Sequence, residues 1–516
     1  MSERYVVGAD VGTSSTRVLV FDSGGRVIGE GRGAYEVLRP KPGWAEQEAD
    51  WWWLAFQQAS REAMAQSGVK PEQVEAVGIT HQRQSIVPLD REMRPIRPAI
   101  LWNDMRCGPQ AEWTNEHVGA QKVYARTGFP PATWSLYKVM WLRDNEPQTY
   151  ERIHKLLLAS DYVAYHLTGE VAIAAGSASA TGALDIERAD RWATDILEAC
   201  GVPLHIWPER ILQGGETVGR VTPAAAQATG LRPGTPVVAT SGDQPCGCLG
   251  AGINRFGVAG INGGTSCTVE VYSEALPIDP KRSYFIEVSP MGGYFPESAI
   301  YSGASALMIW YRDNFGHEEV RAARESGENV WSKIYGLAAE LPAGNTGLML
   351  IPYFAGASGP YWDLRARGIM FGFLEAHGRP HFVRAVMEGQ AYESRRIIEL
   401  IEQGTGRKVT ELRMYGGSAV SDLWNQMFAD VLNIPVCTTH SAETTSLGAA
   451  ICAARGAGIY DTVGEAVGQM VQVKDTYEPV PDNVAVYEDL FSRVYRHFYD
   501  RVQDLVHEVS VITKLP

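Results

Sequence analysis

Short apolar runs separated by small polar residues open the chain. An apolar run at 5–7 leads to Asp10, small residues follow at 12–15, and an alternating run at 17–22 reads as a returning strand. Residues 26–31 continue the β-like pattern. Apolar runs bounded by glycine and hydroxyl residues are typical of strands joined by tight turns. The pattern predicts a three-stranded antiparallel meander.

The same pattern returns about half a chain later, at 257–273. An apolar run leads into the small residues 263–266, and an alternating strand follows at 268–272. The triplet Gly-Thr-Ser occupies 12–14 in the first copy and 264–266 in the second. Self-similarity of this kind indicates repeated architecture, so we expect a duplicated half.

The remaining pattern predicts an α/β protein. Strands are expected at 74–80, with 85–90 as its partner, at the beginning of 98–106 and at 235–240, and polar residues follow the ends of several of them. Ligand sites of open α/β sheets collect at such strand ends. Helical spacing or helix start and stop signals predict helices at 43–56, 134–145, 153–167, 304–315, 329–339, 380–402, 421–432 and 487–511.

Length and charge narrow the function classes. A chain of 516 residues is too long for one core, so two large domains are expected. Its net charge of -14 disfavours a nucleic-acid groove and an anionic membrane surface. Seven cysteines without Cys-x-x-Cys spacing fit reduced thiols, and no apolar run approaches a membrane span. We therefore expect a cytoplasmic protein.

Three turns rich in glycine and hydroxyl residues follow predicted strands, at 12–15, 263–266 and 416–418. Such turns bring backbone N–H groups close to anionic oxygens. They have neither the lysine of a P-loop nor the Gly-x-Gly-x-x-Gly dinucleotide pattern. Each turn alone is also compatible with a purely structural role. Together, in a duplicated chain, they predict a nucleotide held between two halves.

Two aspartates follow predicted strands and suit phosphoryl transfer. Asp243 comes after 235–240 and is the candidate general base for a substrate hydroxyl; the alternative is an exposed turn residue. Asp10 lies beside the first turn, where a carboxylate suits Mg²⁺.

Polar and aromatic residues at two other strand ends suit a small polyhydroxylated molecule. They are Arg83, Gln84, Trp102, Asn103 and Asp104, and the alternative is simple solvation of loop ends. His81 is interpreted as a buried histidine whose hydrogen bonds are satisfied. Lys138, in a helical pattern, is interpreted as a surface charge.

Motifs along nearly the whole chain resemble the FGGY carbohydrate kinases, a family that includes glycerol, xylulose, ribulose, fuculose and autoinducer-2 kinases. They include ADVGTSSTRVLVFD at 9–22, GITHQRQS at 78–85, AILWNDMR at 99–106, GDQPCGCLGAG at 242–252 and YGGSAVSDLWNQMFADVL at 415–432. Thr133 departs from the family's first signature. Arg83-Gln84 differs from the Arg-Glu of glycerol kinases and from the Met-His of xylulose kinases.

The resemblance implies two actin-like, ribonuclease-H-like domains around a central cleft. Residues 1–253 would bind the sugar and carry the base, and 254–516 would bind ATP. Position by position, Asp243 matches the catalytic base and Asp10 the acid near Mg²⁺. Substrate-lining positions match Arg83, Gln84, Trp102, Asp104 and Asp243; nucleotide-binding positions match Thr13, Ser14, Gly264, Thr265, Gly303, Gly416, Gly417 and Ser421.

The expected activity is ATP-dependent phosphorylation of a hydroxyl on a small sugar, with a ketopentose such as xylulose as first choice. Glycerol, another polyol or an autoinducer-2-like dihydroxy ketone is the alternative substrate. An actin-like ATPase without a sugar substrate is the alternative from another class. ATP and Mg²⁺ are the expected cofactors, with a small sugar or polyol as partner and a homodimer as a possible assembly.

Overall fold

The first half of the chain forms a six-stranded mixed sheet. The computed structural model describes residues 4–264 and 266–513. Strands β1, β2 and β3 are an antiparallel meander, as predicted, whereas β5 and β12 run parallel to β1 and β11 pairs antiparallel with β12. In sheet order the strands are β11 (Thr217–Arg220), β12 (Pro236–Val238), β5 (Val74–His81), β1 (Tyr5–Val11), β2 (Ser15–Asp22) and β3 (Val27–Ala34).

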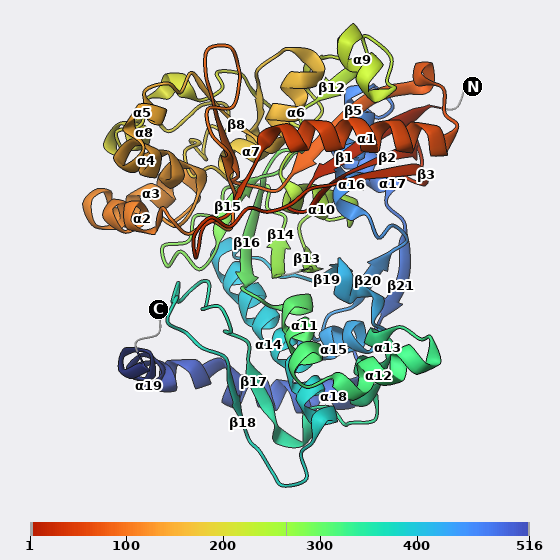
Figure 1. The fold of residues 1–516 in the computed structure, drawn as a ribbon. Coiled ribbons are helices and arrows are strands. Elements are labelled where there is room, and N and C mark those ends of the chain that lie inside the picture. The colour runs from red at the N-terminus through yellow and green to blue at the C-terminus, as the bar shows by residue number, and fades with distance from the viewer. Residues whose placement is uncertain (1–3, 265, 514–516) are drawn as a thin grey trace.

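The second half repeats this sheet with one more edge strand. The pair β13 and β14 is antiparallel, β14 and β16 are antiparallel, and β19 and β20 run parallel to β13. This repetition, seen one sheet above the other in Figure 1, agrees with the duplicated half predicted from the sequence. The order is β15 (Phe285–Val288), β16 (Tyr294–Ile300), β14 (Cys267–Val271), β13 (Val258–Gly263), β19 (Glu411–Tyr415), β20 (Val436–Thr439) and β21 (Val473–Tyr477).

Glycines at alternate positions of β3 receive the first long helix, α1 (Ala49–Ser67). A Cβ atom on Gly31 would lie 2.1 Å from the Ala59 carbonyl oxygen, and one on Gly33 would lie 2.6 Å from that of Ala55. Side chains two apart in a strand share a face, and residues four apart share a helix stripe. A glycine stripe on β3 therefore packs against an alanine stripe on α1.

The helix that follows the last parallel strand of the second half packs on the first sheet. This helix, α16 (Thr444–Gly456), approaches so closely that a Cβ on Gly8 would lie 2.0 Å from the Ser446 oxygen. Together with α17 (Val463–Met470) it buries apolar residues of β1 and β2. Figure 1 shows these two blue helices among the red strands.

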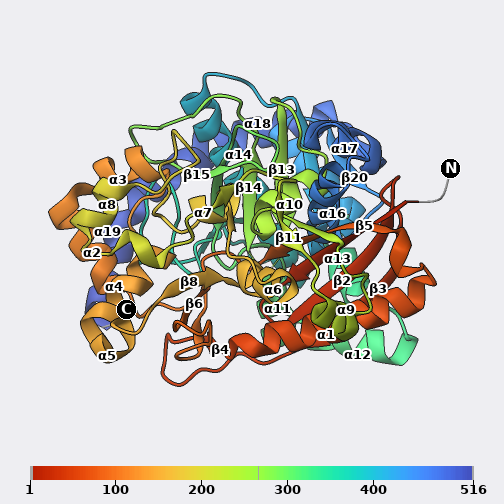
Figure 2. The ribbon, with the colours of Figure 1, turned by 90° about the horizontal axis from the view of Figure 1, so that it is seen from above.

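Helix α16 also packs against its counterpart in the first half, α10 (Asp243–Gly250), as Figure 2 shows from above. A Cβ on Gly250 would lie 1.9 Å from the Thr444 oxygen, and one on Gly448 would lie 1.8 Å from the Cys246 oxygen. Each helix therefore presents a glycine to the backbone of the other, and the two halves meet through this pair.

A four-stranded sheet is inserted into the first half, and it corrects two predictions. Strand β6 pairs with β7 and β8, not with β5, so 85–90 is not the partner of 74–80. The predicted helix at 153–167 begins as strand β8 and becomes helical at Ala159. The sheet contains β4 (Glu46–Gln47), β7 (Ala99–Ile100), β6 (Ile86–Leu89) and β8 (Lys155–Leu158).

Helices complete the rest of both halves. In the first half they are α2 (Gly108–Thr114), α3 (Ala120–Thr127), α4 (Ser135–Asn145), α5 (Pro147–Tyr150), α6 (Ala159–Thr168), α7 (Ala175–Ser179), α8 (Thr194–Ala199) and α9 (Pro223–Thr229). In the second half they are α11 (Ala304–Asn314), α12 (His317–Ser326), α13 (Val330–Ala339), α14 (Arg379–Thr405), α15 (Asp422–Leu432), α18 (Pro481–Leu490) and α19 (Arg496–Thr513). Two small ladders add β9 (Ile173–Ala174) with β10 (Ile211–Leu212), and β17 (Met349–Ile351) with β18 (Ile369–Phe371).

Several helix predictions are confirmed within a few residues, including 304–315, 329–339, 380–402 and 421–432. The predicted C-terminal helix at 487–511 is instead two helices, α18 and α19, joined by a π-helical turn at Phe491–Tyr495. Across 4–264 and 266–513, no helix has the length and apolarity needed to cross a membrane.

Candidate active site

Parallel strands of the first sheet bring distant residues to one edge. Asp10 lies near the end of β1, Arg83 follows β5 by two residues, and Asp243 begins α10 shortly after β12. The carboxyl ends of parallel strands meet at the same edge, where ligands of α/β sheets bind. The structure thus brings together the predicted base, the predicted metal ligand and one predicted substrate residue.

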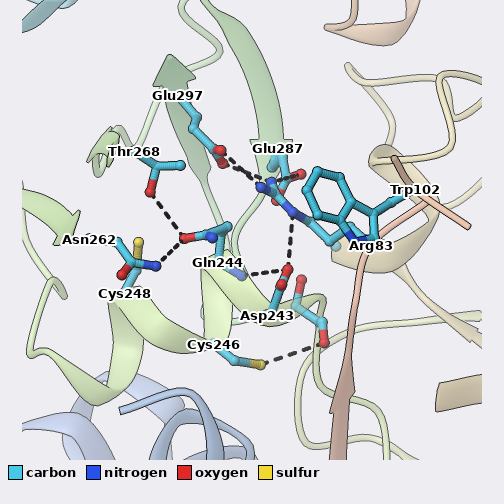
Figure 3. A network of polar contacts seen from close by, with 12 residues as sticks. Arg83, Trp102, Asp243, Gln244, Cys246, Cys248, Asn262, Thr268, Glu287 and Glu297 are labelled. Carbon is cyan, nitrogen blue, oxygen red and sulfur yellow. Dashed lines mark hydrogen bonds and ion pairs between the residues drawn. The ribbon is translucent and has the colours of Figure 1, made fainter. Parts of the chain in front are cut away.

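Arg83 connects this edge to the second half of the molecule (Figure 3). Its Nε lies 3.2 Å from Oδ1 of Asp243. Its Nη1 and Nη2 donate to the two carboxylate oxygens of Glu297 over 2.8 and 2.9 Å, and Nη1 also donates to Glu287. The forked guanidinium matches a carboxylate in this two-bond geometry. Arg83 is therefore held by carboxylates from both halves.

Burial governs the ionisation of these acids. The Asp243 side chain keeps 36% of its surface exposed, but the loss of surrounding water raises its pKa, and Arg83 partly opposes the rise. Burial raises the pKa of Glu287 to about 8, and it also raises the pKa of Glu297, while Arg83 lowers both. A general base is most effective with a pKa near the working pH, so the shift of Asp243 suits that role.

Asp10 has the properties expected of a carboxylate that binds a cation. Its Oδ1 is buried and has no hydrogen-bond partner among the described residues. Burial, followed by the charge of Asp243, raises its pKa to about 7, whereas Arg17 lowers it. No cluster of three or more His, Cys, Asp or Glu suited to a metal occurs within the described ranges. Mg²⁺ is commonly held by one or two carboxylates plus phosphate oxygens, so Asp10 fits it.

Arg17 is the neighbour of Asp10 across the β1–β2 ladder and reaches the second half of the chain. Its Nη1 donates to both carboxylate oxygens of Glu443, each over 2.7 Å. Glu443 is the residue immediately before α16. This ion pair is a second electrostatic link between the halves.

Side chains from outside the β1–β2 hairpin hold its turn in place. The indole Nε1 of Trp102 donates to Oγ1 of Thr13 over 3.0 Å, and Gln47 donates to the Thr13 carbonyl over 2.7 Å. Ser14 is exposed beside it. Trp102 itself is 40% exposed. The turn therefore presents Thr13 and Ser14 next to an accessible aromatic surface.

Gln84 is held in an unusual backbone conformation by a buried lysine. Its φ is +66°, a region that non-glycine residues rarely adopt. Nζ of Lys138 donates to the Gln84 carbonyl over 3.3 Å and to the Thr133 carbonyl over 2.6 Å. Lys138 is fully buried, and burial lowers its pKa to about 8. The interpretation of Lys138 as a surface charge was wrong.

Asp104 lies in the layer behind the site. It is fully buried, its Oδ2 accepts from the Ala45 amide over 2.6 Å and from Arg106 over 2.7 Å, and its Oδ1 accepts from Arg106 over 2.8 Å. Its carboxylate is thus occupied by protein groups. His81 is also fully buried, but both ring nitrogens lack partners among the described residues, so the expectation of a satisfied histidine was wrong.

The glycine-rich turns of the second half pack into one cluster. A Cβ on Gly416, whose φ is +79°, would lie 2.4 Å from Oδ1 of Asn262, and one on Gly263 would lie 1.4 Å from Oγ of Ser418. The Ser305 amide donates to the Gly264 carbonyl over 3.0 Å. The predicted positions Gly264, Gly303, Gly416, Gly417 and Ser421 belong to the turns at 262–264, 303–305 and 416–421, whereas Thr265 lies outside the described residues.

Gln244 joins the glycine cluster to the base. It follows Asp243 at the start of α10, and its Oε1 accepts from Nδ2 of Asn262 over 2.9 Å and from Oγ1 of Thr268 over 3.1 Å. Figure 3 shows these bonds beside the Arg83 network. The predicted acceptor side and the predicted nucleotide side are therefore in direct contact.

Family models match both halves of this arrangement. Residues 5–250 match the N-terminal domain of the FGGY family of carbohydrate kinases, and residues 259–457 match its C-terminal domain. The chain belongs to the FGGY family of carbohydrate kinases. Its activity class is therefore phosphoryl transfer from ATP to an alcohol group, which separates it from actin-like ATPases without a sugar substrate.

Individual relatives of this FGGY kinase match over almost the whole chain. A xylulose kinase of Bacillus subtilis is 30% identical over 503 residues, covering 97% of this chain and 98% of the relative. A glycerol kinase of Deinococcus radiodurans is 32% identical over 495 residues, covering 93% and 94%. The crystal structure of a xylulose kinase from Rhodospirillum rubrum has a TM-score of 0.86 at 27% identity, covering 98% and 100%. The two-domain actin-like fold is thus shared.

Sequence reasoning missed three acids of this FGGY kinase. Glu270, Glu287 and Glu297 are buried on β14, β15 and β16. Each stands in a short strand rich in apolar residues, and a charged residue at a buried strand position needs a partner. That anomaly was the available signal, but Arg83, the partner of Glu287 and Glu297, lies about 200 residues away, and Glu270 accepts from Tyr415.

Proposed function

We propose that this FGGY kinase phosphorylates a hydroxyl of a ketopentose, with xylulose as the first candidate. The observation that carries the proposal is Asp243 at the first turn of α10, with a raised pKa and with Nε of Arg83 at 3.2 Å. The xylulose kinases among the relatives support the choice of sugar. Acceptance of a hydroxyl proton requires such a carboxylate within reach of the acceptor.

The acceptor is proposed to lie against the strand ends of the first half. Asp243 takes the proton of the attacking hydroxyl, while Arg83, Gln84 and Trp102 orient the sugar. Asp104 acts on this pocket indirectly, because its carboxylate already holds Arg106 and the Ala45 amide. Phosphoryl transfer depends chiefly on positioning and charge stabilisation, so side chains held rigidly at this edge contribute to the rate.

The nucleotide is proposed to lie against the glycine turns, so that residues 1–253 bind the sugar and 254–516 bind ATP. Thr13 and Ser14 would face the transferred phosphate from the first half. Backbone N–H groups of the second half would hold the remaining phosphates, since a turn without side chains lets an anion come close to the backbone. The positions are Gly264, Thr265, Gly303, Gly416, Gly417 and Ser421.

Asp10 is the proposed protein ligand of Mg²⁺. A bound cation would give its buried Oδ1 a partner and would lower its raised pKa. When bound there, Mg²⁺ supplies charge neutralisation to the phosphate oxygens. The chain's own contribution is to hold Asp10 close enough to Arg17 and Asp243 for both charges to act on its carboxyl group.

Glycerol or another polyol is the second candidate acceptor, with an autoinducer-2-like dihydroxy ketone beside it. The glycerol kinases at 32% identity favour glycerol, as does an arginine at position 83. The test is ADP release by the purified protein with xylulose, ribulose, glycerol, erythritol and the autoinducer-2 precursor. We expect kcat/KM for xylulose to exceed that for glycerol by at least ~10-fold. A preference for glycerol would overturn the choice of sugar.

A further inference from the structure

We infer that Glu287 and Glu297 make the acceptor site selective for uncharged sugars and polyols, and against sugar acids, by occupying the guanidinium of Arg83. This inference rests on the proposed function and names the substrate class of the same site. The two glutamates would be specificity-determining residues contributed by the second half of the chain.

The two glutamates are placed on one face of neighbouring strands. In the β15–β16 ladder Glu287 lies opposite Phe295, and Glu297 follows two residues later, so both side chains point to the same side. Glu270 on β14 is directly opposite Glu297 and points to that side as well. All three are buried. Three adjacent strands therefore line one wall with acids.

Arg83 meets this wall with both of its terminal nitrogens. Glu297 accepts from Nη1 and Nη2, Glu287 accepts from Nη1, and the remaining Nε faces Asp243. Three carboxyl groups thus surround one guanidinium whose side chain is only 12% exposed. Four of the five N–H groups of Arg83 thus face protein carboxylates, and little of the guanidinium charge is left for a carboxylate of the acceptor.

Three other cations of the first half also have partners within the protein. Arg17 is bound by Glu443, Arg106 by Asp104, and Lys138 donates to two backbone carbonyls. A sugar acid placed against Asp243 would bring another carboxylate beside carboxylates, while Arg17, Arg106 and Lys138 already have partners in the protein. Like charges brought together away from water are strongly unfavourable. A neutral acceptor avoids this cost and can donate its hydroxyls to the acids.

The test compares neutral acceptors with sugar acids of similar size. ADP release is measured with xylulose and xylitol against xylonate and gluconate, for the wild type, E297Q and E287Q/E297Q. We expect the wild type to prefer the neutral acceptors by at least ~100-fold in kcat/KM. Both variants should reduce that preference by at least ~10-fold, because Arg83 becomes able to pair with the acid.

Two further variants isolate the cause. Adding R83M to E287Q/E297Q should abolish the gained binding of xylonate, measured by isothermal titration calorimetry. E393Q is the matched control, since it takes a carboxylate from the buried Arg396 on α14, away from the site, and it should leave the preference unchanged. Thermal unfolding of each variant verifies that it is folded, and calorimetry of xylonate against xylitol on the wild type gives a measurement that does not depend on the variants.

The outcomes separate the inference from the proposed function. A wild type that uses or binds sugar acids as well as neutral acceptors overturns the inference while phosphoryl transfer stands. Neutral acceptors that turn over in a folded E287Q/E297Q with an unchanged preference also overturn it. If no acceptor releases ADP, the proposed function fails, and the calorimetry still decides whether the site rejects a carboxylate.

Discussion

The two halves of the molecule share a sheet but differ in the chemistry of their first turns. Aligning 9–15 with 261–267 places Asp10 opposite Asn262, so a charged residue in one half corresponds to an amide in the other. Oδ1 of Asp10 is buried and has no partner among the described residues, whereas Asn262 donates an amide hydrogen to Gln244. At this turn the duplicated scaffold therefore carries a carboxylate in the first half only.

The two halves also differ at the start of the helix that follows the last parallel strand. Asp243 begins α10 and contacts Arg83, whereas Glu443 precedes α16 and contacts Arg17. The second half instead contributes backbone, through glycines that leave no room for side chains. Duplication supplied two similar frames, and the acid at the helix start contacts Arg83 in one of them and Arg17 in the other.

Exchanging the acid on α10 gives the largest expected effect. In D243N the hydroxyl proton has no acceptor, so kcat should fall at least ~100-fold while the sugar Kd changes by less than ~3-fold. Its counterpart E443Q, measured in the same ADP-release assay, should lose less than ~10-fold. Equal losses in both variants would show that the two helix starts are functionally equivalent and break the comparison.

Converting the first turn to the chemistry of the second tests the metal. D10N makes position 10 resemble Asn262 and removes the buried carboxylate, so the Mg²⁺ concentration for half-maximal activity should rise at least ~10-fold. Activity is titrated against Mg²⁺ at saturating ATP and sugar. D22N, at the far end of β2, is the control. An unchanged Mg²⁺ titration in D10N would remove Asp10 from the metal site.

Adding a side chain to the glycine cluster tests the backbone half. G416A introduces strain at a φ of +79° and a contact with Asn262, so the KM for ATP should rise about 10-fold. The KM for the sugar should change little. G336A in α13, where nothing lies within 4 Å of the new Cβ, should leave both constants unchanged. A rise in the sugar KM alone would assign the cluster to the acceptor.

The buried lysine has a matched control within the same half. K138M removes the donor shared by the Gln84 and Thr133 carbonyls, so the sugar KM should rise about 10-fold with kcat nearly constant. Lys155 also donates to two backbone carbonyls, those of His205 and Trp207, but away from the site. Steady-state kinetics of K155M should therefore match the wild type.

The effect that is smallest at neutral pH concerns acid stability. Burial lowers the pKa of His81 to about 3, so the folded protein keeps it neutral while the unfolded chain takes up a proton near pH 6.5. The free energy of unfolding therefore falls as the pH drops from about 6.5 to about 3. Denaturant unfolding of H81L should lose that slope, up to ~1.4 kcal/mol per pH unit. H205Q, at an exposed histidine, should keep it.

Local pattern predicted much of the fold because local forces decide it. The meander, the repeated turn and the capped helices follow from residue spacing and turn chemistry. Strand pairing does not, and 85–90 therefore pairs with β7 and β8 rather than with its neighbour in sequence, β5. The short apolar run Leu156–Leu158 is compatible with either a helix or a strand, and pairing with β6 makes it a strand.

Motifs mark part of the candidate site in the sequence, whereas contacts between residues far apart in the chain leave no such mark. Asp243, Asp10 and the glycine turns stand out as small or acidic residues after strands. Lys138 was misread because its partners are backbone carbonyls, which leave no mark in the sequence. Glu297 depends on Arg83, more than 200 residues earlier, and only the folded chain brings the two together.

The packing of α16 and α17 on the first sheet also fixes the order in which the protein can be completed. Val6, Leu19 and Phe21 are covered by residues of α16 and α17, which the ribosome adds only after the first sheet and all but strand β21 of the second. Until the chain reaches residue 470, that face of the N-terminal half remains open to water and to other chains. The core around β1 and β2 is therefore complete only after α17 has been synthesised. Until then the nascent chain exposes apolar surface and needs protection from aggregation.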